Sequence, residues 1–205
     1  MQFLDQRILG IIVLLLWAML VVVKKMTTGS LLRDRPHGGV WIWLTHVFNF
    51  FFLLVANPLA AILLLVPRAQ ALDPTHLRLE APSLLTGLGA AGILLYAAGY
   101  ILLAWALSTL HGNYQVGGSD PRASDELVVR GPYRFVRHPM YASVLYISLG
   151  LACLTHSLAY FCVFCIYVLL ILSLIPVEEE GLRRAYGERY AVYQKTVNRL
   201  VPLLY

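Results

Sequence analysis

The chain has 205 residues, of which 59% are hydrophobic and 13% charged, and its formal net charge is +5. With a mean hydropathy of +0.70, this composition is too apolar for an ordinary soluble domain and indicates an integral membrane protein. Membrane topology accounts for the excess of basic residues, so no nucleic-acid partner is expected.

Three apolar segments in the first 110 residues predict membrane-spanning helices. The first runs from Ile8 to Val23 and ends in a lysine pair instead of a signal-peptide cleavage site. The second runs from about Val40 to Val66, and Asn57-Pro58 predicts a kink or break within it. The third runs to about Leu110, with Ser83 expected to cap its N-terminus.

The rest of the chain predicts a polar insert followed by a helical hairpin. Glycines and prolines between His111 and His138 exclude a continuous helix, and so long an insert suggests a function. Two apolar runs, Met140 to Leu154 and Leu158 to Ile175, have a short connection and are therefore expected to be antiparallel. The first arm is short for a membrane span. Pro176 is expected to end the last span.

A cytosolic amphipathic helix is predicted after the last span. Apolar and aromatic side chains recur there at spacings of three or four residues, which is typical of one helical face. These side chains are Leu182, Tyr186, Tyr190, Tyr193 and Val197. The tail is therefore expected to dock as a single helix.

Basic residues are distributed unevenly across this five-span layout. Of the 16 lysines and arginines, only Arg7, Arg68 and Arg78 fall on the same side as the N-terminus. Because cytoplasmic loops are enriched in lysine and arginine, the bias predicts an outside N-terminus and a cytoplasmic C-terminus. The prediction is an all-α integral membrane protein with five transmembrane helices and one domain, residues 1–205. Residues 1–110 would form three spans, and residues 111–205 the insert, hairpin and tail.

The segment from Gly131 to Tyr141 is polar, basic and rich in turns. Pro139 suits the first position of a helix, which would place His138 at the N-cap. The positive end of the helix dipole would then lie beside Arg134 and Arg137. Together these groups predict an anion site.

The predicted hairpin returns Glu178 and Glu179 to the membrane face that carries Arg137 and His138. An acidic and basic cluster at a membrane boundary is suited to a zwitterionic ligand that has both an amine and a carboxylate. The alternative is that these side chains pair with one another and that the basic residues anchor lipid head groups.

Two separated motifs occupy roughly the C-terminal third. The first is Gly131-Pro-Tyr-Arg-Phe-Val-Arg-His-Pro-Met-Tyr141. The second begins at Glu178-Glu179 and continues with Leu182, Tyr186-Gly187, Tyr190, Tyr193, Val197, Arg199 and Pro202. Together they resemble the isoprenylcysteine carboxyl methyltransferase family and its phospholipid methyltransferase relatives. In those enzymes these segments surround S-adenosylmethionine, and a hydrophobic acceptor enters from the bilayer.

The resemblance implies a set of site residues. No metal site is expected, because Cys162 and Cys165 form a lone CxxC without a second pair or a nearby histidine cluster. The cofactor-binding residues would be Tyr133, His138, Pro139, Tyr141, Glu178, Glu179, Tyr190 and Tyr193. Arg137 and Glu179 would serve catalysis, and Asn113 and Tyr114 are further candidates for the pocket. A multi-pass protein of the inner or plasma membrane is expected, and the bias of basic residues predicts that its active site faces the cytoplasm.

The methyl acceptor is less defined than the methyl donor. In the eukaryotic members of the family, an arginine four residues before the paired glutamates helps to hold the substrate carboxylate, and Leu174 stands at that position here. The expected acceptor is a lipophilic molecule with a prenylcysteine-like carboxylate or thiol. The alternatives are phospholipid N-methylation, an NADPH-dependent sterol-type reductase with a similar tyrosine-rich tail, and a non-enzymatic lipid-binding protein.

Overall fold

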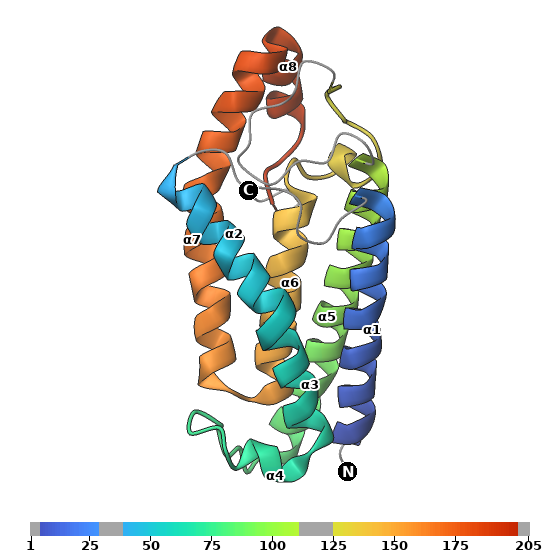
Figure 1. Cartoon of the computed structure of the whole chain (residues 1–205), viewed down its shortest axis with the longest axis vertical. Coiled ribbons are helices and arrows are strands. Elements are labelled where there is room, and N and C mark those ends of the chain that lie inside the picture. The colour runs from blue at the N-terminus through green and yellow to red at the C-terminus, as the bar shows by residue number, and fades with distance from the viewer. Residues whose placement is uncertain (1–4, 29–38, 111–124, 201–205) are drawn as a thin grey trace.

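The structure, a computed structural model, describes residues 5–28, 39–110 and 125–200. Helices run along the long axis of the molecule (Figure 1). The helical segments that lie along this axis are α1 (Gln6–Thr28), the α2 to α3 segment, α5 (Pro82–Leu110), α6 (Pro139–Thr155) and α7 (Leu158–Tyr186). The start of α1 and the short α4 (Pro67–Gln70) lie at one end, and α8 (Glu188–Thr196) lies at the other.

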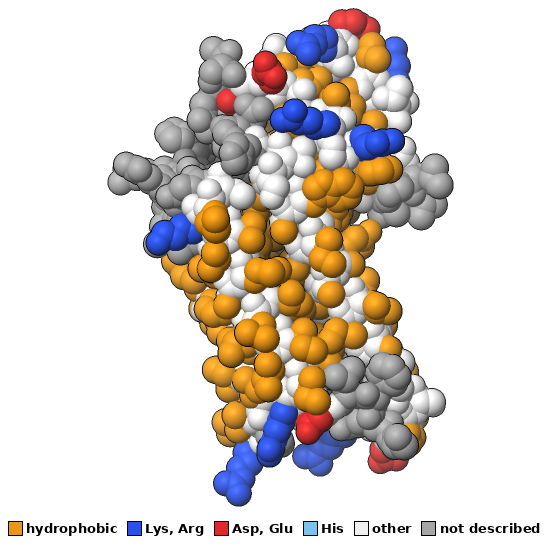
Figure 2. All heavy atoms as spheres, turned by 90° about the vertical axis from the view of Figure 1, so that its right-hand side faces the viewer, with side chains coloured by type: hydrophobic (Ala, Val, Ile, Leu, Met, Phe, Trp, Pro, Cys, Tyr) orange, Lys and Arg blue, Asp and Glu red, His pale blue; other side chains and the backbone are white. Residues whose placement is uncertain are grey.

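The predicted all-α membrane fold is confirmed. Within the described residues, four helical segments are long and apolar enough to cross a membrane: Gln6–Thr27, Val40–Leu65, Pro82–Leu110 and Leu158–Tyr186. The fifth predicted span, α6, is apolar but has only 17 residues. Hydrophobic side chains cover the middle of the molecule, and charged side chains gather at its two ends (Figure 2).

The break predicted at Asn57-Pro58 is a π-helical turn. The second span consists of α2 (Val40–Phe51), the π-helical turn η1 (Phe52–Ala56) and α3 (Asn57–Leu65). Three carbonyls of η1 accept hydrogen bonds from side chains. Phe52 accepts from Asn57 Nδ2 at 3.0 Å, Leu53 from Trp17 Nε1 at 2.7 Å, and Ala56 from the Tyr160 hydroxyl at 2.7 Å. The irregular turn is therefore tied to α1 and α7.

Glycines bring α5 and α6 into close contact. A Cβ atom at Gly150 would lie 2.7 Å from the backbone nitrogen of Tyr96, and one at Gly99 would lie 2.8 Å from the Ser143 carbonyl oxygen. The small residues therefore allow two backbones to approach where larger side chains would clash. This contact sets the position of α6, which carries one wall of the site.

Gly150→Ala is expected to destabilise the protein by about 1–3 kcal/mol, because the added methyl group meets the backbone of α5. Gly87→Ala in α5 is the matched control, since a Cβ atom there meets nothing within 4 Å. The control should be neutral or stabilising by about 0.5–1 kcal/mol. Thermal unfolding in detergent compares the two, and equal melting temperatures would contradict the packing argument.

Three boundary predictions are wrong. The helix α7 continues through Pro176 to Tyr186, because buried residues on either side, Ile175 and Glu179, keep the next turn packed. The tail is not one helix, because Gly187, with φ of +55°, separates α7 from α8. Ser83 does not precede α5, because Pro82 takes the first helical position.

Candidate active site

The start of α6 is held by the end of the tail. As predicted, α6 begins at Pro139 and His138 is its N-cap residue. The backbone N–H of Arg137 donates to the Asn198 carbonyl at 2.7 Å, and that of His138 donates to the Arg199 carbonyl at 2.9 Å. Two extended segments thus pair beside the N-terminus of α6.

Glu179 is the centre of a buried ionic network. Its Oε1 accepts from Arg137 Nε at 2.9 Å, lies 2.7 Å from Arg137 Nη2, and lies 3.2 Å from His138 Nε2. Its Oε2 accepts from Gln194 Nε2 at 3.3 Å and Arg199 Nη2 at 3.2 Å. The predicted approach of Glu179 to Arg137 and His138 is confirmed, and at 4% exposure the carboxylate links α6, α7, α8 and the tail.

The anion that occupies the predicted basic site is the carboxylate of Glu179. Arg137 also donates through Nη1 to the carbonyls of Gln194, at 3.0 Å, and Val197. Its guanidinium therefore holds the tail. The prediction that Arg134 belongs to the anion site is wrong, because this side chain is exposed and lies over the Phe135 ring.

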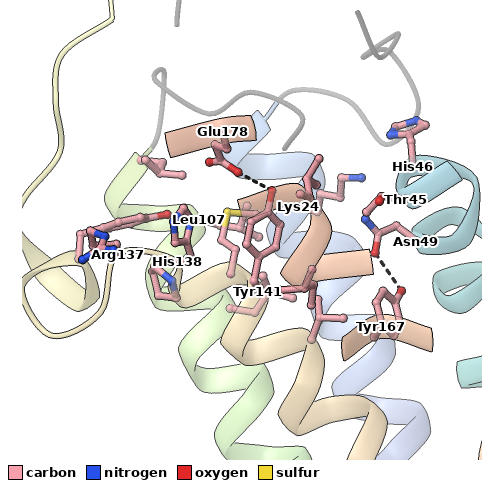
Figure 3. Close-up of a pocket in the computed structure, with 18 of the residues that line it drawn as sticks. Lys24, Thr45, His46, Asn49, Leu107, Arg137, His138, Tyr141, Tyr167 and Glu178 are labelled. Carbon is pink, nitrogen blue, oxygen red and sulfur yellow. Dashed lines mark hydrogen bonds between the residues drawn. The ribbon is translucent and has the colours of Figure 1, made fainter. Parts of the chain in front are cut away.

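The Glu178 side chain contacts Tyr141, which is not one of the partners of Glu179 described above. Its Oε2 accepts a hydrogen bond of 2.5 Å from the Tyr141 hydroxyl (Figure 3). The Tyr141 ring stacks on the His138 ring with 5.5 Å between centroids. Consecutive helical residues point about 100° apart, which allows Glu178 and Glu179 to serve different surfaces.

Two tyrosines of α8 complete the polar end. The Tyr193 hydroxyl donates to the Tyr133 carbonyl at 2.5 Å. The Tyr190 hydroxyl is buried and has no hydrogen-bond partner among the described residues. Burial raises the pKa of both phenols above the ordinary range, and Glu179 adds to this effect at Tyr190. Both hydroxyls therefore stay protonated and can donate.

A cavity of about 380 Å³ joins these residues to the interior of the helical bundle. The predicted site residues that line it are Tyr133, Arg137, His138, Pro139, Tyr141, Glu178, Tyr190 and Tyr193. Glu179 is absent from the lining and lies behind Arg137 and His138. Asn113 and Tyr114 lie outside the described residues. Toward the bundle interior the lining becomes apolar, with Leu20, Leu53, Leu103, Val144 and Ile171.

This cavity has a second polar wall, which was not predicted from the sequence. It is formed by Lys24 of α1 and by Thr45, His46 and Asn49 of α2 (Figure 3). Asn49 Oδ1 accepts from the Tyr167 hydroxyl at 2.9 Å. Three polar residues close together in an otherwise apolar span were the available signal, because polar groups at membrane depth are costly and often functional.

Residues 88–189, roughly half of the chain, match the model of the phospholipid methyltransferase family. The chain belongs to this family. A similar solved structure is the eukaryotic intramembrane Ras methyltransferase, isoprenylcysteine carboxyl methyltransferase. It has a TM-score of 0.57 and 18% identity over 92% of this chain and 74% of that chain, which shows a shared fold. No curated protein matches the sequence significantly.

Membership of the phospholipid methyltransferase family makes this protein a membrane methyltransferase. The matched range contains α6 and α7, and so includes Arg137, His138, Glu178 and Glu179. The polar wall on α1 and α2 lies outside that range. The family match therefore covers the wall formed at α6 and α7 and does not cover the wall formed by α1 and α2.

Proposed function

We propose that this methyltransferase uses S-adenosylmethionine to methylate a lipophilic acceptor that carries a prenylcysteine-like carboxylate or thiol. One observation carries the proposal: a single cavity joins a charged end beside α6, α7 and α8 to an apolar end between the membrane helices. A polar cofactor and a hydrophobic acceptor can meet in such a space.

The residues at the polar end fit the chemistry of S-adenosylmethionine. The Glu178 carboxylate can accept from an amine, and the Tyr141 and His138 rings offer an aromatic surface. The Tyr190 hydroxyl is a buried donor without a hydrogen-bond partner in the described part of the chain. Tyr133, Pro139 and Tyr193 complete this part of the lining. When bound, the cofactor supplies an activated methyl group.

Arg137 and Glu179 act in this proposal by positioning. Their ion pair holds the tail against the N-terminus of α6, so that Tyr190 and His138 face one cavity. A carboxylate or thiolate acceptor is already a nucleophile and needs no strong general base. Alignment of the two reactants then supplies much of the rate acceleration.

The proposal places the site at the cytoplasmic face of an inner or plasma membrane, with the N-terminus outside. Arg7, Arg68 and Arg78 belong to the end that carries the start of α1 and α4, and the site lies at the other end with α8 (Figure 1). The described basic residues near that other end include Lys24, Lys25, Arg130, Arg134, Arg137, Arg183, Arg184, Arg189, Lys195 and Arg199. The excess of positive charge supports this orientation.

A second candidate is phospholipid N-methylation, which the family match favours. An amine acceptor must lose a proton, and the Glu178 carboxylate lines the cavity where it could take one. The methyltransferase match supports neither the NADPH-dependent reductase nor the non-enzymatic lipid-binding alternative.

The test uses purified protein in lipid nanodiscs with methyl-labelled S-adenosylmethionine. Label in a base-labile ester of a prenylated cysteine, or in a methyl thioether formed from a lipophilic thiol, supports the first candidate, and label in phospholipid supports the second. Glu178→Gln is expected to weaken S-adenosylhomocysteine binding about tenfold, through loss of one charged hydrogen-bond acceptor. The exposed Glu180→Gln is the control. Binding of NADPH without binding of S-adenosylhomocysteine would contradict both candidates.

A further inference from the structure

We propose that Lys24, Thr45, His46 and Asn49 form a subsite for the anionic head group of the lipophilic acceptor. We call these four residues the donor wall. The inference rests on the proposed function and deepens it, because it assigns the acceptor's head group to α1 and α2. The ligand chemistry is a carboxylate or a phosphate attached to a long apolar chain.

The donor wall lines the same cavity as the polar end of the cofactor site. In Figure 3, Lys24, Thr45, His46 and Asn49 lie to one side of Tyr141 and Glu178, and Arg137 and His138 lie to the other. A ligand between the donor wall and Tyr141 would therefore lie next to the proposed cofactor. This is the position that an acceptor needs.

Lys24 and Asn49 supply the donors of the donor wall that favour an anion. The Thr45 hydroxyl donates to the Trp41 carbonyl at 2.9 Å, so Thr45 only lines the subsite. Lys24 carries an ammonium group, which only donates hydrogen bonds. Asn49 uses its Oδ1 to accept from Tyr167, so its amide nitrogen, which also only donates, is the atom left for a ligand. Carboxylate and phosphate oxygens are the matching acceptors.

Charge within the cavity points to Lys24. Among the described residues, Lys24 and Arg137 are the lysine and arginine of the lining. The guanidinium of Arg137 is bonded to Glu179 and to two backbone carbonyls of the tail. Asp125, Glu126 and Glu178 also line the cavity. Lys24 is the cation that the donor wall contributes to the lining, and its ammonium can donate to an anionic head group.

The apolar lining next to the donor wall fits the rest of such a molecule. Leu20 and Val21 precede Lys24 on α1, and Leu53 and Leu54 follow Asn49 in the second span. Leu174 also lines the cavity and adds no charge. A prenyl or acyl chain can therefore extend into the bundle while its head group stays at the donor wall.

The test measures the affinity of full-length protein in nanodiscs for paired probes. One pair is N-acetyl-S-farnesylcysteine and its carboxamide, and the other is a short-chain phosphatidic acid and the matching diacylglycerol. Lys24→Met is expected to weaken binding of the anionic member about tenfold in at least one pair and to leave the uncharged member unchanged. The pair that responds identifies carboxylate or phosphate as the head group.

Lys25→Met is the matched control, because Lys25 is the exposed neighbour of Lys24 and is absent from the cavity lining. Lys24→Arg should keep the preference for the anion. The subsite is refuted if Lys24→Met and Lys25→Met have equal effects, or if charged and uncharged probes lose affinity equally. S-adenosylhomocysteine binding is measured on the same samples. Its absence in wild type would refute the proposed cofactor, while the paired probes still decide the subsite.

Discussion

Glu179→Ala is expected to lower the free energy of unfolding by about 3–5 kcal/mol, because it leaves the Arg137 side chain, which is only 8% exposed, without its ion-pair partner. Gln194 and Arg199 lose the same carboxylate. The loss should release the tail from α6 and abolish S-adenosylhomocysteine binding. Thermal unfolding and proteolysis of the tail measure the two effects.

The neighbouring glutamate provides the control for this experiment. Glu180 is exposed and pairs only at the surface with Arg183 and Arg184, so Glu180→Ala should change stability by less than about 0.5 kcal/mol. If Glu179→Ala unfolds at the same temperature as Glu180→Ala, the ionic network does not hold the tail. A similar protease sensitivity of the two variants would lead to the same conclusion.

Tyr190→Phe is expected to change stability and ligand affinity in opposite directions. The substitution removes a buried hydroxyl that has no hydrogen-bond partner within residues 5–28, 39–110 and 125–200, so the ligand-free protein should gain about 1 kcal/mol. If the hydroxyl donates to the cofactor, S-adenosylhomocysteine binding should weaken about tenfold. Melting temperatures with and without S-adenosylhomocysteine test both expectations.

Tyr193→Phe is the control that separates this effect from a general effect of removing a tyrosine hydroxyl from α8. The Tyr193 hydroxyl donates to the Tyr133 carbonyl, so its removal should destabilise the ligand-free protein by about 1 kcal/mol. A Tyr190→Phe protein that is less stable than wild type and binds S-adenosylhomocysteine normally would show that the hydroxyl has a structural role.

Local sequence signals predicted the features that depend on nearby residues. Pro139 marked the start of α6 and therefore placed His138 at its N-cap. The short connection after Thr155 predicted the hairpin, and the hairpin predicted that Glu179 would approach Arg137. These inferences needed only helix geometry and the lengths of the apolar runs.

Features that depend on tertiary packing could not be predicted in the same way. Pro176 was expected to end a helix, but its removal of one hydrogen bond is offset by the packing of neighbouring buried residues. Glu178 lines the cavity and Glu179 holds the tail, and this difference depends on which face of α7 meets the tail. The donor wall was missed because its members belong to two helices far from the recognised motifs.

The π-helical turn η1 has a consequence for how the acceptor side of the cavity could change. One extra residue in a turn shifts the helical register, so that α2 is rotated by about 100° relative to its orientation in an unbroken helix. Deleting one residue from Phe52–Ala56 would therefore turn Thr45, His46 and Asn49 away from their present direction without altering any of them. Substrate preference in this protein can thus depend on the length of a backbone segment as well as on the identity of the side chains.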